Sequence, residues 1–351
     1  MATILFAGHN LHFIEGLIDR FSHEGHTILR DQWQGHTIHD EEASHTLLEQ
    51  ADIIICEWAL GNSVWYSNQT KPNQRLFIRF QRQEIETDFP NQINWDSVEK
   101  MVFTAPYFHM LAIENFSIPP EKTTFIPNYV ETSRFALSKS RDSKYTIGML
   151  GIVPRLKRLD RALDILKIVR AQDPRYNIRI KGKLPEDYAW MLKREEEMNW
   201  YQEQFDRIES DPTLNGHVHF DEWGPDVPQW FTKINHILSV SDYEGSHQAV
   251  AEGASSGAVP TVVKWNGADQ IYPSDWCFDD LESAAQAILD RSSTSQNGLK
   301  WSRVIRKRYD IKRIYKRWNK LLGIEKSLLS RFLSTLFPSS PSSAEIQVEE
   351  E

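Results

Sequence analysis

Short apolar runs alternate with helix-forming patterns along this chain, and the series starts again after a polar stretch at residues 138–144. Buried strands that alternate with helices are typical of parallel sheets with helices on both faces. The pattern therefore predicts two doubly wound α/β halves, with a ligand bound between them at the carboxyl ends of the strands. The expected strands are residues 4–7, 53–56, 76–78 and 101–103, then 146–150, 178–180, 218–220, 237–240 and 259–263, with helices at 11–22, 41–50 and 156–170.

The length of 351 residues agrees with this division, because a single hydrophobic core rarely grows to that size. We expect residues 1–137 to form one Rossmann-like domain, residues 138–144 a linker, and residues 145–300 a second Rossmann-like domain. From Trp301 to Lys320, Arg and Lys alternate with apolar residues, which predicts one basic amphipathic helix within residues 301–323.

Composition excludes several classes of function. A net charge of −9 does not favour nucleic acid as a partner. The two cysteines, Cys56 and Cys277, have neither a disulfide framework nor metal-ligand spacing, so a reducing compartment is expected. No apolar run reaches the roughly 18 residues of a membrane span, and no secretory signal is recognisable, so we expect a cytoplasmic protein.

Two glutamates stand eight positions apart in the segment 239–260, which reads SVSDYEGSHQAVAEGASSGAVP. Glu244 is expected on the loop after a buried strand, and Glu252 inside the helix that follows, with Ser246 as its N-cap. The free N–H groups of a helix start, next to Gly245, can bind an anion such as phosphate. The alternative is an ordinary strand, loop and helix with two solvated glutamates.

A second turn carries positive charge. It runs from Gly148 to Lys157, and Gly151 permits tight passage beside a ligand, while Arg155 and Lys157 could neutralise a diphosphate. Taken alone, this segment is consistent with an ordinary turn that has basic neighbours. Together with the two glutamates it predicts a nucleotide-sugar site, in which cations and amides bind the diphosphate and carboxylates bind hydroxyl groups.

These motifs resemble those of the retaining glycosyltransferases of family four, which have the GT-B fold of two Rossmann-like domains. The resemblance covers residues 1–322 and is carried in order by IPNYV at 126–130, by 151–157 with LDRAL at 159–163, by the glutamate pair, and by GAVP at 257–260 with NGA at 266–268. It implies an N-terminal acceptor domain, a C-terminal nucleotide-sugar-binding domain, and a terminal helix at 301–323 that crosses back to the first domain.

The resemblance also implies roles for single residues. Glu252 would hold the ribose, Glu244 the transferred sugar and Lys157 the diphosphate. Backbone amides near Gly245 and Ser246, with His247 beside them and Gly151 opposite, would complete the donor site.

The chain departs from the family pattern at two places. Ile152 stands where the family usually has Arg, and Arg155 is our candidate for the missing charge. The family also commonly has a His near the reacting sugar in the N-terminal half, where His9 is the nearest candidate.

Three further charged residues end predicted strands in the first half. Glu57, Arg79 and Arg82 are candidates for contact with the acceptor or the cleft. Loop packing for Glu57, and ion pairing for Arg79 and Arg82, are the structural alternatives.

The function implied is a retaining glycosyltransferase of the hexosyltransferase type, which moves a sugar from a nucleoside-diphosphate donor to a glycan or lipid-linked acceptor, as in surface polysaccharide assembly. No cofactor and no metal are expected, since cations and helix amides can stabilise the leaving diphosphate. The rival is a catalytically silent GT-B protein that binds glycan or another transferase. A phosphorylase or an epimerase on the same fold is a third alternative.

The C-terminal segment 324–351 offers a different interaction. Apolar residues recur at helical spacing between Lys326 and Phe337, with Arg331 on the flank, and the rest is low in complexity and is expected to be disordered. A short amphipathic helix with basic neighbours predicts reversible contact with anionic lipid, at the inner face of a membrane.

Overall fold

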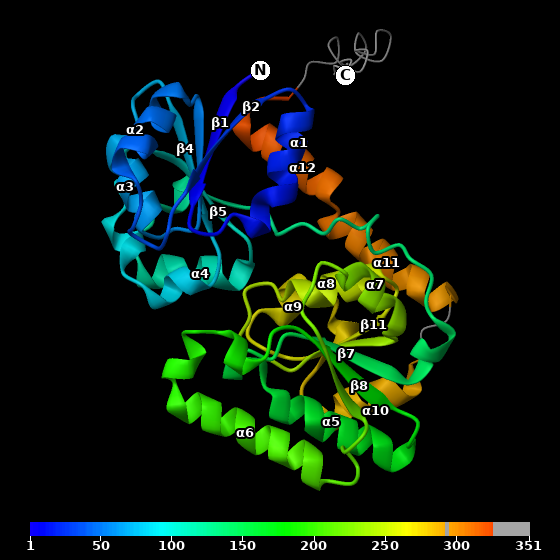
Figure 1. The fold of residues 1–351 in the computed structure, drawn as a ribbon. Coiled ribbons are helices and arrows are strands. Elements are labelled where there is room, and N and C mark those ends of the chain that lie inside the picture. The colour runs from blue at the N-terminus through cyan, green and yellow to red at the C-terminus, as the bar shows by residue number, and fades with distance from the viewer. Residues whose placement is uncertain (292–294, 326–351) are drawn as a thin grey trace, which may run out of the picture.

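The computed structural model describes residues 1–291 and 295–325, which form two parallel six-stranded sheets, each flanked by helices (Figure 1). The first sheet has the order β2-β1-β3-β4-β5-β6 and the second the order β12-β11-β10-β7-β8-β9. The expected architecture of two doubly wound α/β halves is therefore confirmed. The first sheet contains β1 (Thr3–Gly8), β2 (Thr27–Gln32), β3 (Ile53–Glu57), β4 (Arg75–Phe80), β5 (Val98–Phe103) and β6 (Thr123–Phe125). The second contains β7 (Thr146–Leu150), β8 (Asn177–Lys181), β9 (Val218–Asp221), β10 (His236–Ser239), β11 (Val259–Val263) and β12 (Cys277–Phe278).

The helices follow the strands as the sequence pattern indicates. In the first half they are α1 (Glu15–His23), α2 (Glu41–Gln50), α3 (Gly61–Gln69) and α4 (Pro106–Asn115). In the second half they are α5 (Leu159–Gln172), α6 (Glu195–Ser210), α7 (Val227–Trp230), α8 (Gln248–Ser255), α9 (Ala268–Ile271) and α10 (Leu281–Asp290). Two further helices, α11 (Ser295–Tyr309) and α12 (Ile311–Leu322), follow near the end of the described residues.

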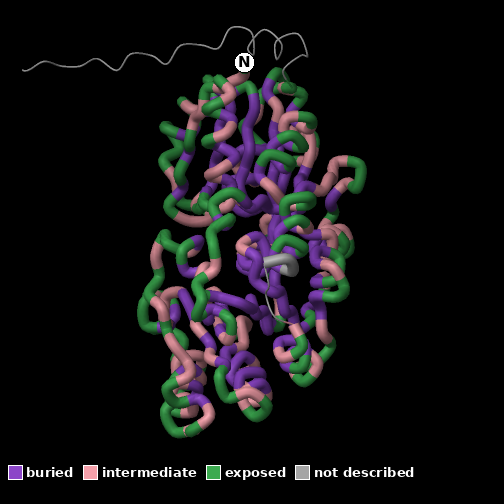
Figure 2. The backbone as a smooth tube through the Cα atoms, turned by 90° about the vertical axis from the view of Figure 1, so that its right-hand side faces the viewer, coloured by how far each residue is buried: buried purple, intermediate pink, exposed green. Residues whose placement is uncertain are grey.

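The strands β3, β10 and β11 are buried along their whole length, and β1 and β7 are buried except for one terminal residue each. Figure 2 shows buried segments running through the middle of both halves. Three strands that the sequence did not indicate, β2, β6 and β12, lie at sheet edges. In β2 only Asp31 is buried, and all three residues of β6 are half-buried. An edge strand that is partly exposed lacks the continuous apolar run of a central strand.

The prediction of a single helix from Trp301 to Lys320 is wrong, because the helix is interrupted at Asp310, which separates α11 from α12. The backbone of Asp310 is not helical, with φ of −57° and ψ of 134°, and its carboxylate accepts a hydrogen bond of 2.9 Å from the Lys312 amide as the N-cap of α12. Two backbone hydrogen bonds with Val130 also hold the chain at this interruption. The Val130 amide donates to the Tyr309 carbonyl at 2.7 Å, and the Val130 carbonyl accepts from the Ile311 amide at 3.0 Å.

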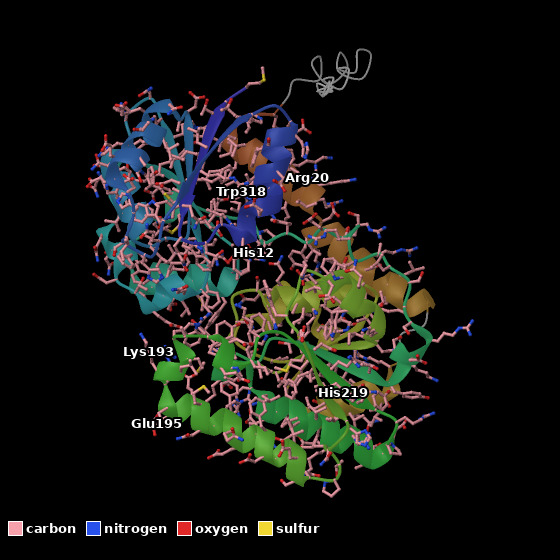
Figure 3. All side chains as sticks on the ribbon, in the orientation of Figure 1. His12, Arg20, Lys193, Glu195, His219 and Trp318 are labelled. Atoms are coloured by element: carbon pink, nitrogen blue, oxygen red, sulfur yellow. The ribbon has the colours of Figure 1, made fainter. Side chains whose placement is uncertain are left out.

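The two terminal helices pack on different halves. α11 lies against α8, whereas α12 lies against α1, and Figure 3 shows Trp318 of α12 beside the helix that carries Arg20. Trp318 is buried in one apolar cluster with Phe21 of α1. The chain thus returns from the second half to the first.

The rest of the predicted C-terminal segment, residues 326–351, lies outside the described residues. Among the residues that the structure describes, no helix has both the length and the apolar character needed to cross a membrane.

Candidate active site

A cleft of about 370 Å³ lies where the carboxyl ends of the two sheets face each other. Both halves contribute to it, because Arg82 follows β4, Lys157 follows β7, and the loop after β10 leads into α8. This is the place at which doubly wound sheets bind ligands. The cleft is lined by Phe13, Trp58, Gln81, Arg82, Gln83, Asn128, Leu150, Lys157, Glu244, Gly245, Ser246, His247, Gln248, Ala249 and Glu252.

Lys157 and Glu244 form an ion pair in the cleft, with 2.5 Å between Nζ and Oε1. The hydroxyl of Ser241 donates to the same carboxylate oxygen at 2.7 Å. Burial alone would raise the pKa of Glu244, but His247, Lys157 and these hydrogen bonds outweigh it and lower the pKa to about 2. Because burial lowers the pKa of His247 to about 4, that imidazole is neutral at neutral pH, and Lys157 is the cation that keeps Glu244 ionised.

His247 stands in a strained position at the start of α8. Its φ of +25° is rare for a residue other than glycine, and such strain is found mainly at functional sites. Nδ1 lies 2.6 Å from the Ser239 hydroxyl, while Nε2 is buried and has no hydrogen-bond partner among the described residues. A buried nitrogen without a partner is uncommon, which makes this residue of the cleft a candidate for contact with a ligand.

Ser246 is not the N-cap of α8, as the sequence suggested, because the helix begins at Gln248 and its cap position is His247. The Ser246 hydroxyl instead accepts a hydrogen bond of 3.1 Å from Asn128 in the first half. The Tyr272 hydroxyl lies 2.8 Å from the Ser246 carbonyl and 2.9 Å from the His247 carbonyl. These contacts hold the loop before α8 through the Ser246 side chain and through the carbonyl groups of Ser246 and His247.

Glu252 lies one turn inside α8 and faces the same cleft. Its carboxylate has no hydrogen bond or ion pair within the described ranges. Burial raises its pKa to about 7, with Arg134 lowering it and Glu131 raising it to smaller extents. An unpaired, partly buried carboxylate is an acceptor for hydroxyl groups of a ligand.

Two residues expected at the donor site lie outside the set that lines the cleft. Arg155 is exposed in a short 3₁₀ turn, η6 (Arg155–Lys157), and its guanidinium lies 5.0 Å from the ring centroid of Trp200. Gly151 directly follows β7 with a φ of +73° and packs against Gly182, whereas Gly245 does line the cleft. Ile152 is buried in the core of the second half, so an arginine in its place would point into that core.

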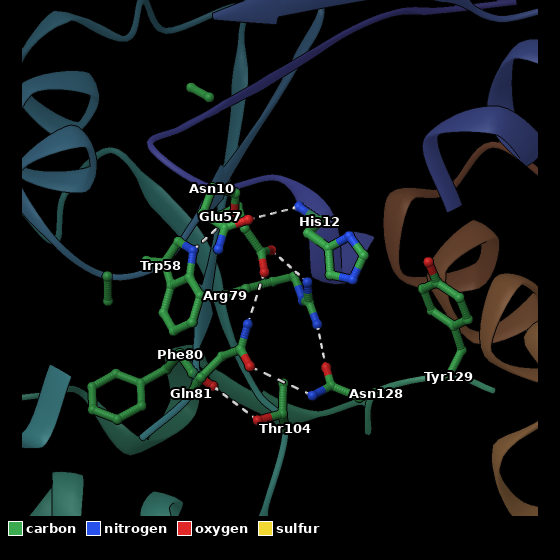
Figure 4. A network of polar contacts seen from close by, with 12 residues as sticks. Asn10, His12, Glu57, Trp58, Arg79, Phe80, Gln81, Thr104, Asn128 and Tyr129 are labelled. Atoms are coloured by element: carbon green, nitrogen blue, oxygen red, sulfur yellow. Dashed lines mark hydrogen bonds and ion pairs between the residues drawn. The ribbon is translucent and has the colours of Figure 1, made fainter. Parts of the chain in front are cut away.

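The expectation that Glu57 and Arg79 face the cleft is wrong, because both are buried and pair with each other (Figure 4). Gln81 donates to Glu57 at 2.8 Å, and Arg79 donates to Asn128 at 2.5 Å. Burial raises the pKa of Glu57, although Arg79 acts against it. Since Asn128 also binds Ser246, this buried network connects the first sheet to the loop before α8.

The other two candidates of the first half have different positions. Arg82 lines the cleft, pairs with Glu86 at 2.8 Å, and places its guanidinium 5.3 Å from the ring centroid of Tyr243 in the second half. His9 does not line the cleft. Its ring packs 4.9 Å from that of His36, and burial and His36 lower its pKa.

Sequence reasoning gave no site role to eight residues that line the cleft, namely Phe13, Trp58, Gln81, Gln83, Asn128, Leu150, Gln248 and Ala249. Two of them gave a signal in the sequence, since Trp58 follows a predicted strand and Asn128 lies in the IPNYV motif. Within residues 1–291 and 295–325, no three His, Cys, Asp or Glu side chains are grouped as a metal site requires.

The fold is shared with several proteins of known structure, although the sequences are distant. HepE from Anabaena, solved with UDP and glucose, has a TM-score of 0.64 at 13% identity over 92% of this chain and 100% of its own. A glycosyltransferase from Rickettsia africae has a TM-score of 0.68 at 13% identity over 92% and 99%. A UDP-forming trehalose-phosphate synthase from Burkholderia xenovorans has a TM-score of 0.67 at 10% identity over 93% and 100%.

No family model and no curated protein sequence matches the chain. The likeness in structure covers nearly the whole chain and agrees with the GT-B fold that the sequence motifs implied.

Proposed function

We propose that this protein is a retaining glycosyltransferase, of the family-four type, that moves a hexose from a nucleoside-diphosphate sugar to a glycan or lipid-linked acceptor. One observation carries the proposal. The unpaired carboxylate of Glu252 and the ion pair of Lys157 and Glu244 line one cleft between the carboxyl ends of two parallel sheets. Relatives in fold whose structures contain UDP and glucose support the same ligand class for this cleft.

Each group has a chemical task in this proposal. Glu252 accepts hydrogen bonds from the ribose hydroxyls, and Glu244 accepts from a hydroxyl of the transferred sugar. Lys157, with backbone amides near Gly245 and Ser246, stabilises the negative charge that develops on the leaving diphosphate. These groups act without a metal ion, so turnover is expected to withstand a chelator.

The test is release of nucleoside diphosphate from a panel of nucleotide sugars by the purified protein, with and without glycan acceptors. We expect release from one donor, and loss of release in Lys157→Ala and Glu252→Gln variants that remain folded. Arg155→Ala, a loss of positive charge on the same turn but outside the cleft, is the matched control. Absence of binding and of release for every donor would refute the proposal.

A specific observation favours one second candidate, a catalytically silent GT-B protein that binds glycan or another transferase. Ile152 is buried in the core, Arg155 lies on Trp200, and His9 does not line the cleft, so three expected contacts with the donor are lacking. Nucleotide-sugar binding without turnover, in the presence of acceptors, would favour this candidate.

We further propose, from the sequence pattern alone, that residues 324–351 bring the protein to anionic lipid near a lipid-linked acceptor. The full chain should then cosediment with anionic vesicles at low salt, and a chain ending at Gly323 should do so much less. Equal binding of the two chains would exclude this segment as the anchor.

A further inference from the structure

A second pocket, of about 350 Å³, lies in the first half of the chain and shares no lining residue with the cleft. It is formed by the loop after β2, by α3 and by a short 3₁₀ turn, η3 (Phe89–Gln92). Its volume falls within the range of about 300 to 1,000 Å³ that is typical of pockets for small molecules.

Aromatic rings held at fixed angles form one wall of this pocket. The rings of Trp33 and His39 stack with centroids 3.7 Å apart and planes at 9°, and Trp65 meets His39 edge to face at 5.0 Å. The buried carboxylate of Asp31 orients the wall, because it accepts hydrogen bonds from Trp33 Nε1 at 2.7 Å and from Tyr66 at 2.6 Å. The wall is therefore preorganised, with Trp65 half-buried at its edge.

The rest of the pocket is uncharged and mostly polar, with Val64 as an aliphatic residue. Thr37, Asn68, Gln69 and Gln92 contribute hydroxyl and amide groups, and Phe89 adds another aromatic ring. None of the described residues that line the pocket is Asp, Glu, Lys or Arg. A phosphate or carboxylate ligand would find no cation here, and a hydrocarbon would leave the amides unpaired. A pyranose matches both surfaces, since one of its faces carries C–H groups and its edge carries hydroxyls.

His36 contacts one lining residue of this pocket and one of the cleft. Its Nε2 lies 3.1 Å from Nε2 of Gln83, which lines the cleft, and its ring centroid lies 6.3 Å from that of Phe89, which lines the pocket. Gly61 allows the loop that carries His36 to lie close to the start of α3, because a Cβ at position 61 would overlap the carbonyl oxygen of His36. A chain of linked sugars could thus extend from the cleft past His36 into the pocket.

We propose that this pocket binds a pyranose unit of the acceptor glycan, at a distance from the unit that receives the transferred sugar. The class of ligand follows from the pocket itself, and its identity as the acceptor rests on the proposed function. Aromatic stacking on Trp65 and hydrogen bonds to Asn68 supply the binding.

The experiment measures binding of maltotriose, cellotriose and N,N′,N″-triacetylchitotriose to the full chain, by saturation-transfer NMR without a donor. At least one probe should bind, and Trp65→Ala should weaken it about tenfold, which is about 1.4 kcal/mol. Asn68→Met places apolar bulk at an exposed position on the rim, so it should lower binding without endangering the fold. Trp200→Ala removes another half-buried helical tryptophan, on α6 of the second half, and should change nothing.

The proposal is overturned if no probe binds, or if the pocket variants bind as well as Trp200→Ala. Donor turnover is measured separately on the same variants. Turnover with no saccharide bound in the pocket refutes the pocket and leaves the proposed function intact. Saccharide bound through Trp65 and Asn68, with no donor ever bound or turned over, keeps the glycan site and refutes the proposed function.

Discussion

Replacing Glu252 with glutamine should stabilise the folded protein at alkaline pH. The substitution keeps the size of the side chain and removes its negative charge, and burial in the cleft destabilises that charge. The folded state raises the pKa from 4.5 to about 7, so the folded protein retains a proton that the unfolded chain releases over this interval. Ionisation of the carboxyl therefore costs folding free energy increasingly from pH 4.5 to about 7, and the full cost is present above that pH.

The magnitude follows from the same two pKa values. At 1.36 kcal/mol per pH unit, they correspond to about 3 kcal/mol. The carboxylate also borders the open cleft, where water screens part of this cost, so we expect Glu252→Gln to raise the free energy of unfolding by about 2 kcal/mol at pH 8. Below pH 4.5 the variant and the natural protein should be equally stable, because both side chains are then neutral.

Urea unfolding followed by tryptophan fluorescence at a series of pH values measures the difference. Glu203→Gln, a change at an exposed position in the middle of α6, is the control and should show no comparable pH dependence. A difference for Glu252→Gln that stays constant across the pH series, or a variant that is less stable at pH 8, would refute the assignment of Glu252 as an uncompensated carboxylate. The same variant should bind the donor more weakly, as expected where stability is sacrificed for function.

Three further outcomes are expected. Lys157→Ala should lower turnover about 100-fold, because the developing charge loses its cation, and should raise the pKa of Glu244, which ¹³C NMR of the carboxyl can follow. Arg79→Leu should destabilise the protein by about 3 to 5 kcal/mol in thermal unfolding, since its carboxylate partner stays buried without a counter-charge. Gly253→Ala should lower the melting temperature despite the better helix propensity of alanine, because the added Cβ would lie 2.6 Å from Cβ of Ile237.

Much of the fold could be predicted because its central strands are short, continuous apolar runs, and such runs are a local property of the sequence. The break at Asp310 could not, since it depends on hydrogen bonds to Val130, which is far away along the chain. The residues from Trp301 to Lys320 keep a helical pattern across the break, so nothing in their own sequence indicates it.

The candidate site shows the same limit. Glu244 and Lys157 could be placed in one site because each follows a central strand of the same parallel sheet, and the structure brings them into contact. The prediction of Ser246 as a helix N-cap was wrong because its hydroxyl binds Asn128, which is 118 residues away, instead of a neighbouring backbone amide. Glu57 also ends a strand, but the side chains of distant residues cover it, which no local pattern reveals.

The return of the chain at Asp310 has a consequence for the order of folding during synthesis. The second half lies on one continuous stretch of chain, whereas the apolar cluster around Phe21 is completed by five residues of α12, namely Ile311, Ile314, Tyr315, Trp318 and Leu322. On the ribosome, where domains usually fold from the N-terminus onward, the half that is made first must wait for α12. The later-made half, with its Glu244 and Glu252, can complete its core earlier. In nascent chains arrested before α12, the second half should therefore resist protease better than the first half.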